Sequence, residues 1–243
     1  GAKRAPQIMK HSITFGIIGY GRFGKLWANC LSRFGDIHVC DKKDSLDKVC
    51  TSDILFLTVP ISEMMNCCKK ITPYLQPHTV VIDTCSVKVE PVRLMKKYLP
   101  KNQPIIATHP LFGQDSVKRF GLKHQKIVVN QVRGTRVQLR TLESVLKKMN
   151  LEIIHATPRA HDLQMARSQA LVHFLGRGIV ELHLKDQMIS TPDFHALLRM
   201  NDMVNNDTWQ LFLDMQRLNP YAKTVRGKLL TSLQKLEHAI TQS

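Results

Sequence analysis

His109 and Ser86 are the side chains of this sequence with the clearest capacity for chemistry, because each follows a predicted strand, 104–108 and 79–83 respectively. In open α/β sheets a ligand lies beyond the carboxyl ends of the strands, so both side chains are expected at the same edge. A neutral imidazole, with an ordinary pKa of about 6.5, can accept a proton at neutral pH. His109 is therefore a candidate general base, although a histidine that merely caps a strand end would give the same pattern.

The turn Gly19-Tyr20-Gly21-Arg22-Phe23-Gly24 lies between the apolar run 13–18 and a segment in which apolar residues recur at helical spacing. In such a turn the first glycine permits the tight bend, the second lets a pyrophosphate approach the backbone, and the third lets helix and strand pack closely. The helix N-terminus adds free N–H groups and the positive end of its dipole. The sequence therefore predicts a dinucleotide-binding turn.

Asp41 ends the second predicted strand, 17 positions after Gly24. A carboxylate there accepts hydrogen bonds from two free ribose hydroxyls and repels a 2′-phosphate, which favours NAD. Lys42 and Lys43 follow directly, and either could bind a 2′-phosphate, so NADP stays open. All three side chains could also be surface residues at a strand end.

Other residues at the ends of predicted strands complete the cofactor cleft. Thr58, Val59 and Pro60 follow the strand that begins at Asp53, and Thr84 follows strand 79–83. We expect these four residues to contact the dinucleotide together with the glycine turn.

The composition is that of an ordinary globular protein, with 243 residues of which 43% are hydrophobic and 22% charged. No apolar run approaches the roughly 18 residues that cross a bilayer, and no cleavable signal opens the chain, so we expect a cytoplasmic protein. The six cysteines form no C-x-x-C pair, which favours free thiols in a reducing compartment and suggests no metal site.

A formal net charge of +16 makes nucleic acid the first partner to consider. The lysines and arginines are spread along the chain, only 6% of residues are aromatic, and no RNA-reading or helix-turn-helix signature is present. Nucleic acid is therefore an unlikely partner. A basic field would instead attract an anionic substrate and an anionic cofactor.

The fold predicted from these patterns is an α/β protein with a Rossmann-type parallel sheet followed by an all-α C-terminal domain. Residues 42–52 are too few for a helix and a third strand, so the sheet should be abbreviated after its second strand. We expect a loose lead-in over 1–12, a dinucleotide-binding domain over 13–156 and a helical domain over 157–243. Its helices are predicted at 158–184, 191–216 and 221–241, with Thr191 and Asn219 as caps.

The segments 83–88 (Asp-Thr-Cys-Ser-Val-Lys) and 108–113 (Thr-His-Pro-Leu-Phe-Gly), after a Rossmann turn, resemble the prephenate/arogenate dehydrogenase family of tyrosine biosynthesis. In the helical part Ser168-Gln169, His173 and Gly176-Arg177 are similar to the plant-type branch that prefers arogenate. The resemblance runs from about Ile13 to Ala239.

This resemblance implies oxidative decarboxylation of a small dianionic cyclohexadienol. By resemblance His109 accepts the hydroxyl proton and Ser86 hydrogen-bonds the imidazole or the substrate. Gln169 and His173, four apart on one helix face, would meet the substrate across the cleft. His173 could instead be a core histidine. Arg199 is the candidate anchor for the substrate carboxylates, although the segment 199–209 departs from the family pattern.

Two other classes of function stay open. One is another two-domain dehydrogenase of the β-hydroxyacid or imine-reducing type. Those families place a catalytic lysine on the first long helix of the second domain, and the lack of an early lysine on that helix argues against this class. The other is a module that binds a dinucleotide or nucleic acid without catalysis. A homodimer through the helical domain is expected in the leading interpretation, because three long apolar-striped helices exceed what one small sheet domain can cover.

Overall fold

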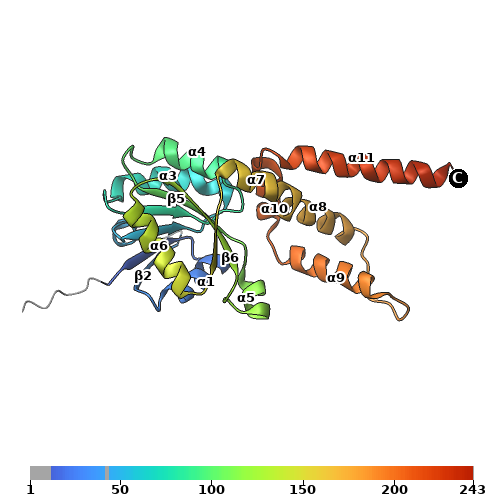
Figure 1. The fold of residues 1–243 in the computed structure, drawn as a ribbon, viewed down its shortest axis with the longest axis horizontal. Coiled ribbons are helices and arrows are strands. Elements are labelled where there is room, and N and C mark those ends of the chain that lie inside the picture. The colour runs from blue at the N-terminus through green and yellow to red at the C-terminus, as the bar shows by residue number, and fades with distance from the viewer. Residues whose placement is uncertain (1–11, 42–43, 243) are drawn as a thin grey trace, which may run out of the picture.

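The computed structural model describes residues 12–41 and 44–242. The first half of the chain forms one seven-stranded sheet of order β2-β1-β3-β4-β5-β6-β7 (Figure 1). Its strands are β1 (Thr14–Ile18), β2 (Asp36–Cys40), β3 (Ile54–Leu57), β4 (Val80–Asp83), β5 (Ile105–Pro110), β6 (Lys126–Arg133) and β7 (Glu152–His155). The predicted α/β architecture is confirmed.

The sheet is abbreviated where the sequence predicted it to be. β2 lies at one edge, and after it the chain forms only the short helix α2 (Asp47–Cys50) before β3. β3 pairs with the other side of β1, from Phe15 opposite Ile54 to Ile18 opposite Leu57. The strand that would extend the sheet beyond β2 is therefore missing from the described residues.

One strand pair differs from the parallel sheet that the sequence predicted. β1 to β5 are parallel to one another, but β6 runs antiparallel to β5, with His109 opposite Val128. The connection through α5 (Gln114–Phe120) explains this, because Leu111 N donates to Lys126 O at 2.9 Å and the chain re-enters the sheet at the edge that it has just left. β7 then follows β6 in parallel.

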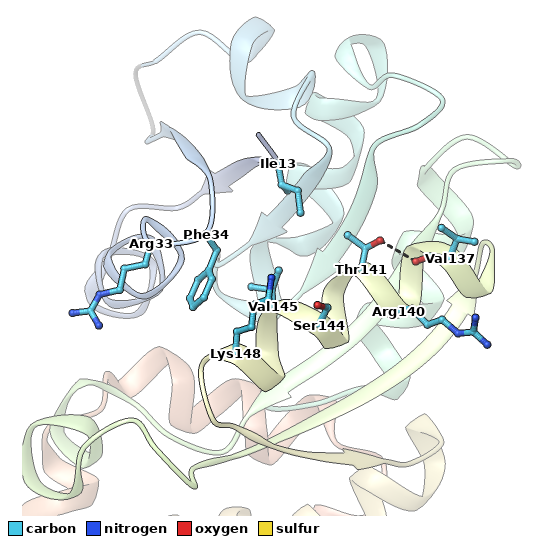
Figure 2. A pocket seen from close by; sticks show the side chains of 9 residues that line it. All are labelled: Ile13, Arg33, Phe34, Val137, Arg140, Thr141, Ser144, Val145 and Lys148. Carbon is cyan, nitrogen blue, oxygen red and sulfur yellow. Dashed lines mark hydrogen bonds between the residues drawn. The ribbon is translucent and has the colours of Figure 1, made fainter. Parts of the chain in front are cut away.

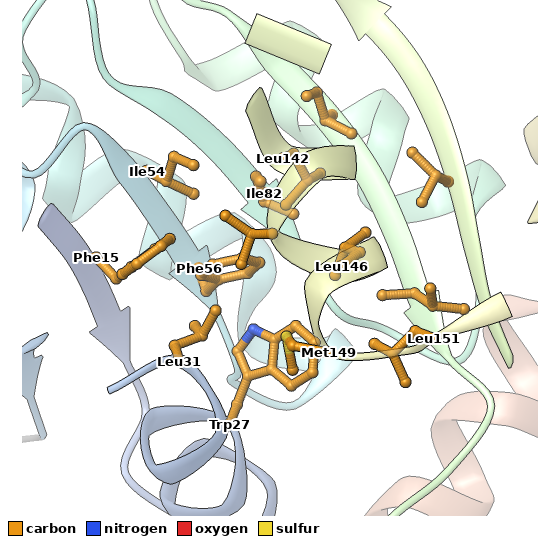
Figure 3. Packing of buried hydrophobic residues seen from close by; sticks show 14 of the residues in the cluster. Phe15, Trp27, Leu31, Ile54, Phe56, Ile82, Leu142, Leu146, Met149 and Leu151 are labelled. Atoms are coloured by element: carbon orange, nitrogen blue, oxygen red, sulfur yellow. The ribbon is translucent and has the colours of Figure 1, made fainter. Parts of the chain in front are cut away.

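Two apolar layers cover the faces of the sheet. Ile54 and Phe56 of β3 face one layer and Leu55 and Leu57 the other, because side chains alternate along a strand. The first layer contains α1 (Arg22–Leu31) and α6 (Arg136–Lys148), with Trp27 edge-on to Phe56 at 5.6 Å between ring centres (Figure 3). The second contains α3 (Met64–Ile71) and α4 (Val89–Tyr98).

The chain beyond β7 is helical and lies to one side of the sheet (Figure 1). Its elements are α7 (Pro158–Arg167), α8 (Gln169–Val180), α9 (Pro192–Asn205), α10 (Trp209–Leu218) and α11 (Ala222–Thr241). No helix in the described ranges is long and apolar enough to cross a membrane.

Two of the three long helices predicted here are in fact pairs. Ser168, with φ −119° and ψ −91°, interrupts the first, and Thr208 caps a new helix by accepting a hydrogen bond from Leu211 N at 3.1 Å. The predicted cap Thr191 is confirmed, since its hydroxyl accepts from Phe194 N. The predicted cap Asn219 is wrong, because the N-cap of α11 is Tyr221 and Asn219 is the C-cap of α10.

Candidate active site

The glycine turn joins β1 to α1 in the way that the sequence predicted. Gly19 has φ +96°, a conformation that residues with a side chain rarely adopt. The Thr58 hydroxyl lies 2.5 Å from Gly19 O and 3.0 Å from Ile18 O. Thr58 therefore fixes the turn through its backbone carbonyls.

The two remaining glycines of the turn have different surroundings. A Cβ atom on Gly24 would lie 2.1 Å from Gly19 O, so only glycine lets α1 pack this closely on β1. A Cβ atom on Gly21 would meet nothing within 4 Å. Gly21 is also the N-cap of α1, where backbone N–H groups lack helical partners. Open space beside a helix N-terminus fits the pyrophosphate of a dinucleotide.

Two side chains within the turn contact other elements of the protein. Arg22 donates to both carboxylate oxygens of Asp115 on α5, at 2.8 and 2.9 Å, and to Asn206 O at 2.6 Å. Its guanidinium therefore links α1, α5 and the end of α9. Phe23 stacks on Trp27 at 5.7 Å and belongs to the apolar layer.

Tyr20 is exposed, with the Lys25 ammonium 5.7 Å from its ring centre. Asp41, directly after β2, is also exposed, and its backbone N donates to Asp44 Oδ2 at 2.8 Å. The predicted competitors Lys42 and Lys43 lie outside the described residues. The choice between NAD and NADP therefore stays a prediction.

The remaining predicted cofactor residues follow β3 and β4 at the edge that holds the glycine turn. Val59 and Pro60 lead into a short 3-10 helix, Ile61–Glu63. The Thr84 hydroxyl donates to Leu57 O at 3.1 Å, which ties the end of β4 to β3.

His109 lies near the carboxyl end of β5 and is only 3% exposed. Its Nδ1 atom is 2.8 Å from Nε2 of His161 on α7. Nδ1 of His161 lies in turn 2.7 Å from Oδ1 of Asp162. The candidate base is thus the first member of a buried row of three side chains.

Asp162 is fixed by backbone groups from two other elements. Its Oδ1 accepts from Lys88 N at 2.7 Å and its Oδ2 from Val89 N at 2.8 Å, at the N-terminus of α4. Asn219 Nδ2 donates to the Asp162 carbonyl at 2.8 Å. This carboxylate therefore attaches α7 to the sheet domain.

The buried ammonium group of Lys88 lies beside the row formed by His109, His161 and Asp162. The Lys88 ammonium pairs with the Asp83 carboxylate and donates to Thr108 O. Burial, followed by the effects of His161 and Lys88, holds the pKa of His109 well below its ordinary value. Burial also lowers the pKa of His161, and this outweighs the opposing hydrogen bond to Asp162. Both rings are neutral at neutral pH.

Ser86 is half-buried between β4 and α4. The hydrogen bonds of the described residues include none between Ser86 and His109. The predicted role of Ser86 as the partner of that ring or of the substrate therefore stays a prediction.

A row of polar side chains lies on α8, where Gln169, His173 and Arg177 follow one another at intervals of four. His173 Nε2 is 3.6 Å from Asp207 Oδ2, and an Arg177 Nη atom donates to Asp207 O at 2.5 Å. The row keeps three buried atoms without a hydrogen-bond partner, namely Gln169 Oε1, His173 Nδ1 and Arg177 Nε. Such atoms are available to a polar ligand.

Arg199 is not brought to this row. On α9 it is exposed, whereas the α9 residues Asn201 and Val204 are buried, and Val204 packs against Gly176 of α8. Positions 199 and 201 lie on nearly opposite sides of a helix with 3.6 residues per turn. The arginine on the row itself is Arg177, and the predicted role of Arg199 as a carboxylate anchor stays a prediction.

The sequence analysis missed His161 and Asp162. A signal was present, because these two adjacent polar residues lie in the first turns of a helix that follows directly on the sheet. Their importance depends on α7 crossing to the end of β5, and the sequence pattern alone carries no information about that crossing.

A separate surface pocket of about 570 Å³ lies between Ile13, the end of α1 and α6 (Figure 2). Arg33, Arg140 and Lys148 line it. Ile13 precedes β1, so this pocket is at the amino-terminal ends of the strands, and the glycine turn is at their carboxyl ends. It is therefore no part of the candidate active site.

Comparison with known sequences identifies two matching regions. A family model described as "Prephenate dehydrogenase, nucleotide-binding domain" matches residues 31–155, and one described as "TYRAAT1-like, C-terminal domain" matches residues 179–243. Arogenate dehydrogenase 2, chloroplastic, from Arabidopsis thaliana is 24% identical over 87% of this chain and 65% of its own length. Arogenate dehydrogenase 1, chloroplastic, from the same plant is 28% identical over 82% of this chain and 35% of its own length.

The chain thus spans about two thirds or less of these two relatives. Among solved structures, prephenate dehydrogenase from Aquifex aeolicus, in complex with hydroxyphenyl propionate and NAD+, superposes with a TM-score of 0.75 at 17% identity, covering 95% of this chain and 91% of that one. Arogenate dehydrogenase from Synechocystis gives a TM-score of 0.70 at 20% identity, covering 94% and 91%. These structures share the fold of the chain.

Proposed function

Because this chain belongs to the prephenate dehydrogenase family, we propose that it catalyses the NAD(P)-dependent oxidative decarboxylation of prephenate or arogenate in tyrosine biosynthesis. The observation that carries the proposal is the position of a neutral, buried His109 at the carboxyl end of β5, in the same sheet edge as the open glycine turn. A base beside a dinucleotide site is what this reaction requires.

The reaction needs one proton acceptor. The bound nicotinamide supplies the acceptor for the hydride that leaves the ring carbinol carbon. His109 takes the hydroxyl proton, so the C–O bond becomes a carbonyl. The bond to the ring carboxyl group then breaks, CO2 leaves, and its electron pair makes the ring aromatic with a phenolate oxygen. His109 returns the proton to that oxygen, which balances the reaction.

We assign the cofactor to residues 13–156 and the substrate to the cleft that this domain makes with residues 157–243. Gly19, Gly21 and Gly24, with the N-terminus of α1, would hold the pyrophosphate. Exposed Asp41 would accept hydrogen bonds from the ribose, which makes NAD the preferred cofactor in this proposal.

The substrate is a dianion, and Arg177 on the α8 row supplies a matching cation whose Nε–H group is buried and unpartnered. Gln169 Oε1, also buried and unpartnered, would accept a hydrogen bond from a donor group of the substrate, and His173 Nδ1 is a third free polar atom of the row. Arg177 would anchor a carboxylate, because its guanidinium is already held by Asp207 O and lies 5.6 Å from the Trp209 ring centre. The exposed position of Arg199 makes it the weaker candidate.

The experiment that tests this function follows the absorbance of reduced nicotinamide with prephenate or arogenate and with NAD or NADP. Turnover in one combination, reduced strongly in His109→Ala, is the expected result. NADH binding without turnover in all four combinations would identify a non-catalytic dinucleotide-binding module instead. Turnover that survives in His109→Ala would place the base elsewhere.

A further inference from the structure

The hydrogen-bonding state of Asp162 can be read from its neighbours. Its two carboxylate oxygens accept from two backbone N–H groups, those of Lys88 and Val89, at 2.7 and 2.8 Å. Backbone donors at a helix N-terminus stabilise the charged form of a carboxyl group. An ionised carboxylate only accepts hydrogen bonds, so His161 Nδ1, 2.7 Å away, must carry a proton.

The state of the next ring follows from this one. A neutral imidazole has one N–H group and one unprotonated nitrogen. With its proton on Nδ1, His161 presents an unprotonated Nε2 to His109 Nδ1 at 2.8 Å. Two facing lone pairs would repel each other, so His109 Nδ1 is the donor in this contact.

We propose that His161 and Asp162 are positioning residues that keep the proton of neutral His109 on Nδ1 and leave its Nε2 as the basic nitrogen. That this nitrogen then takes a proton from the substrate rests on the proposed function. The tautomer itself rests only on the three side chains and the backbone of α4. This tautomer places the substrate hydroxyl on the Nε2 side of the His109 ring.

Four charged or titratable groups surround the base, and their effects on a proton at Nε2 differ in sign. Lys88 opposes a second positive charge on His109, and its own charge is paired with Asp83. His161 opposes that charge as well, while Asp162 favours a positive charge on His161. When Nε2 accepts a proton, the Nδ1–H bond of His109 can therefore break as an Nε2–H bond forms on His161, which moves the charge next to Asp162.

The tautomer can be measured without turnover. In protein labelled with 15N-histidine, two-bond ¹H–¹⁵N correlations at pH 8 distinguish a protonated Nδ1 from a protonated Nε2 in each ring. We expect His109 to show a protonated Nδ1 and an unprotonated Nε2. A wild-type spectrum with the proton on Nε2 of His109 would overturn the proposal.

Variants test the cause of the preference. His161→Ala removes the acceptor and should shift His109 towards the Nε2-protonated form, whereas His161→Gln, whose amide oxygen can accept from Nδ1–H, should retain the wild-type tautomer. Asp162→Asn should disturb both rings. The matched control is His155→Ala, an exposed histidine on β7 that pairs with Glu143 and should leave His109 unchanged. An unchanged His109 spectrum in His161→Ala would contradict the proposal.

Kinetics separate this inference from the proposed function. His161→Ala should lower kcat by about 10- to 100-fold, less than loss of the base itself, and His161→Gln should recover part of that loss while KM stays the same. NADH titration by fluorescence checks that each variant still binds cofactor. A wild-type protein without dehydrogenase activity would refute the proposed function, and the NMR result would still decide the tautomer.

Discussion

His109 combines burial with a position at the carboxyl end of β5, and these two properties act on its chemistry in different ways. The position brings the ring to the cofactor edge, whereas burial keeps it neutral by lowering its pKa. A group with a lowered pKa keeps its basic form further into the acid range. The ring is therefore available as a base at neutral pH and below.

The first prediction concerns this ring. His109→Ala should reduce kcat by about 10²–10⁴-fold, the usual contribution of a general base, with cofactor affinity nearly unchanged. In the wild type, kcat should fall as the pH drops through the folded-state pKa of His109, and this acid limb should lie below pH 6.5, the ordinary value. Stopped assays across pH check both. An acid limb that survives in His109→Ala would assign it to another group, with His173 as the next candidate.

The second prediction concerns cofactor choice. NAD should give the higher kcat/KM, because the exposed carboxylate of Asp41 follows β2 where a ribose would lie. Asp41→Ser should lower the ratio of the NAD to the NADP value by roughly tenfold, equivalent to about 1.4 kcal/mol. Steady-state kinetics with both cofactors measure the ratio. A wild-type protein that is faster with NADP would show that Lys42 and Lys43 decide the preference.

Single residues also show where sequence reasoning about the site reached its limit. The glycine turn, Thr58 and His109 could be located from strand ends, because the carboxyl edge of a sheet gathers whatever follows each strand. Asp162 could not, because its contacts to Lys88 and Val89 depend on how α7 crosses the sheet domain. Arg199 was chosen by residue type, and the helical phase of α9 directs it to solvent.

At the scale of elements, the junction of β1 and α1 separates two uses of glycine. The Gly24 position is filled by backbone, with Gly19 O 2.1 Å from where a Cβ would lie, and the Gly21 position is open. Gly24 therefore allows α1 to pack closely on β1, and Gly21 leaves space for a ligand. Both appear alike in the sequence.

The third prediction uses this contrast as a matched pair. Gly24→Ala should destabilise the fold by about 1–3 kcal/mol, the usual cost of overpacking, although alanine favours helices. Gly21→Val should leave the melting temperature near the wild-type value and abolish NADH binding. Thermal unfolding and fluorescence titration measure the two effects. Unchanged NADH affinity in Gly21→Val would contradict the assignment of the pyrophosphate to this turn.

The order of elements was largely predictable, and their termini and direction were less so. Short apolar runs located β1 to β5, and the short segment after Asp41 predicted the missing strand. The reversal at β6 was not visible, because α5 returns the chain to the same edge without changing the apolar pattern of the strand. The break between α7 and α8 at Ser168 was not predicted, because apolar residues recur at helical spacing on both sides of Ser168.

At the scale of the whole molecule, the sheet domain is closed by two apolar layers, whereas the helical part leaves much apolar surface uncovered. Met188 is 99% and Ile189 89% exposed in the connection between α8 and α9. α11 extends away from the sheet (Figure 1), and of its residues, all of which the structure describes, Ala222 alone is buried. Four further exposed apolar residues lie along α11: Leu230, Leu233, Leu236 and Ile240.

The fourth prediction is that this surface is buried in a homodimer. A contiguous apolar stripe on an extended helix is unfavourable in water, and a second copy of the same stripe covers it with two-fold symmetry. Light scattering after size exclusion, at micromolar concentration, should give twice the mass of the 27.7 kDa chain.

The double variant Leu230→Glu/Leu233→Glu places two charges on one face of α11 and should yield monomers, because burial of an unpaired charge opposes association. Lys235→Glu, which changes charge elsewhere on the same helix, is the matched control and should stay dimeric. A wild-type monomer would contradict the proposed dimer, and a double variant that stays dimeric would move the interface from α11 to the exposed connection between α8 and α9.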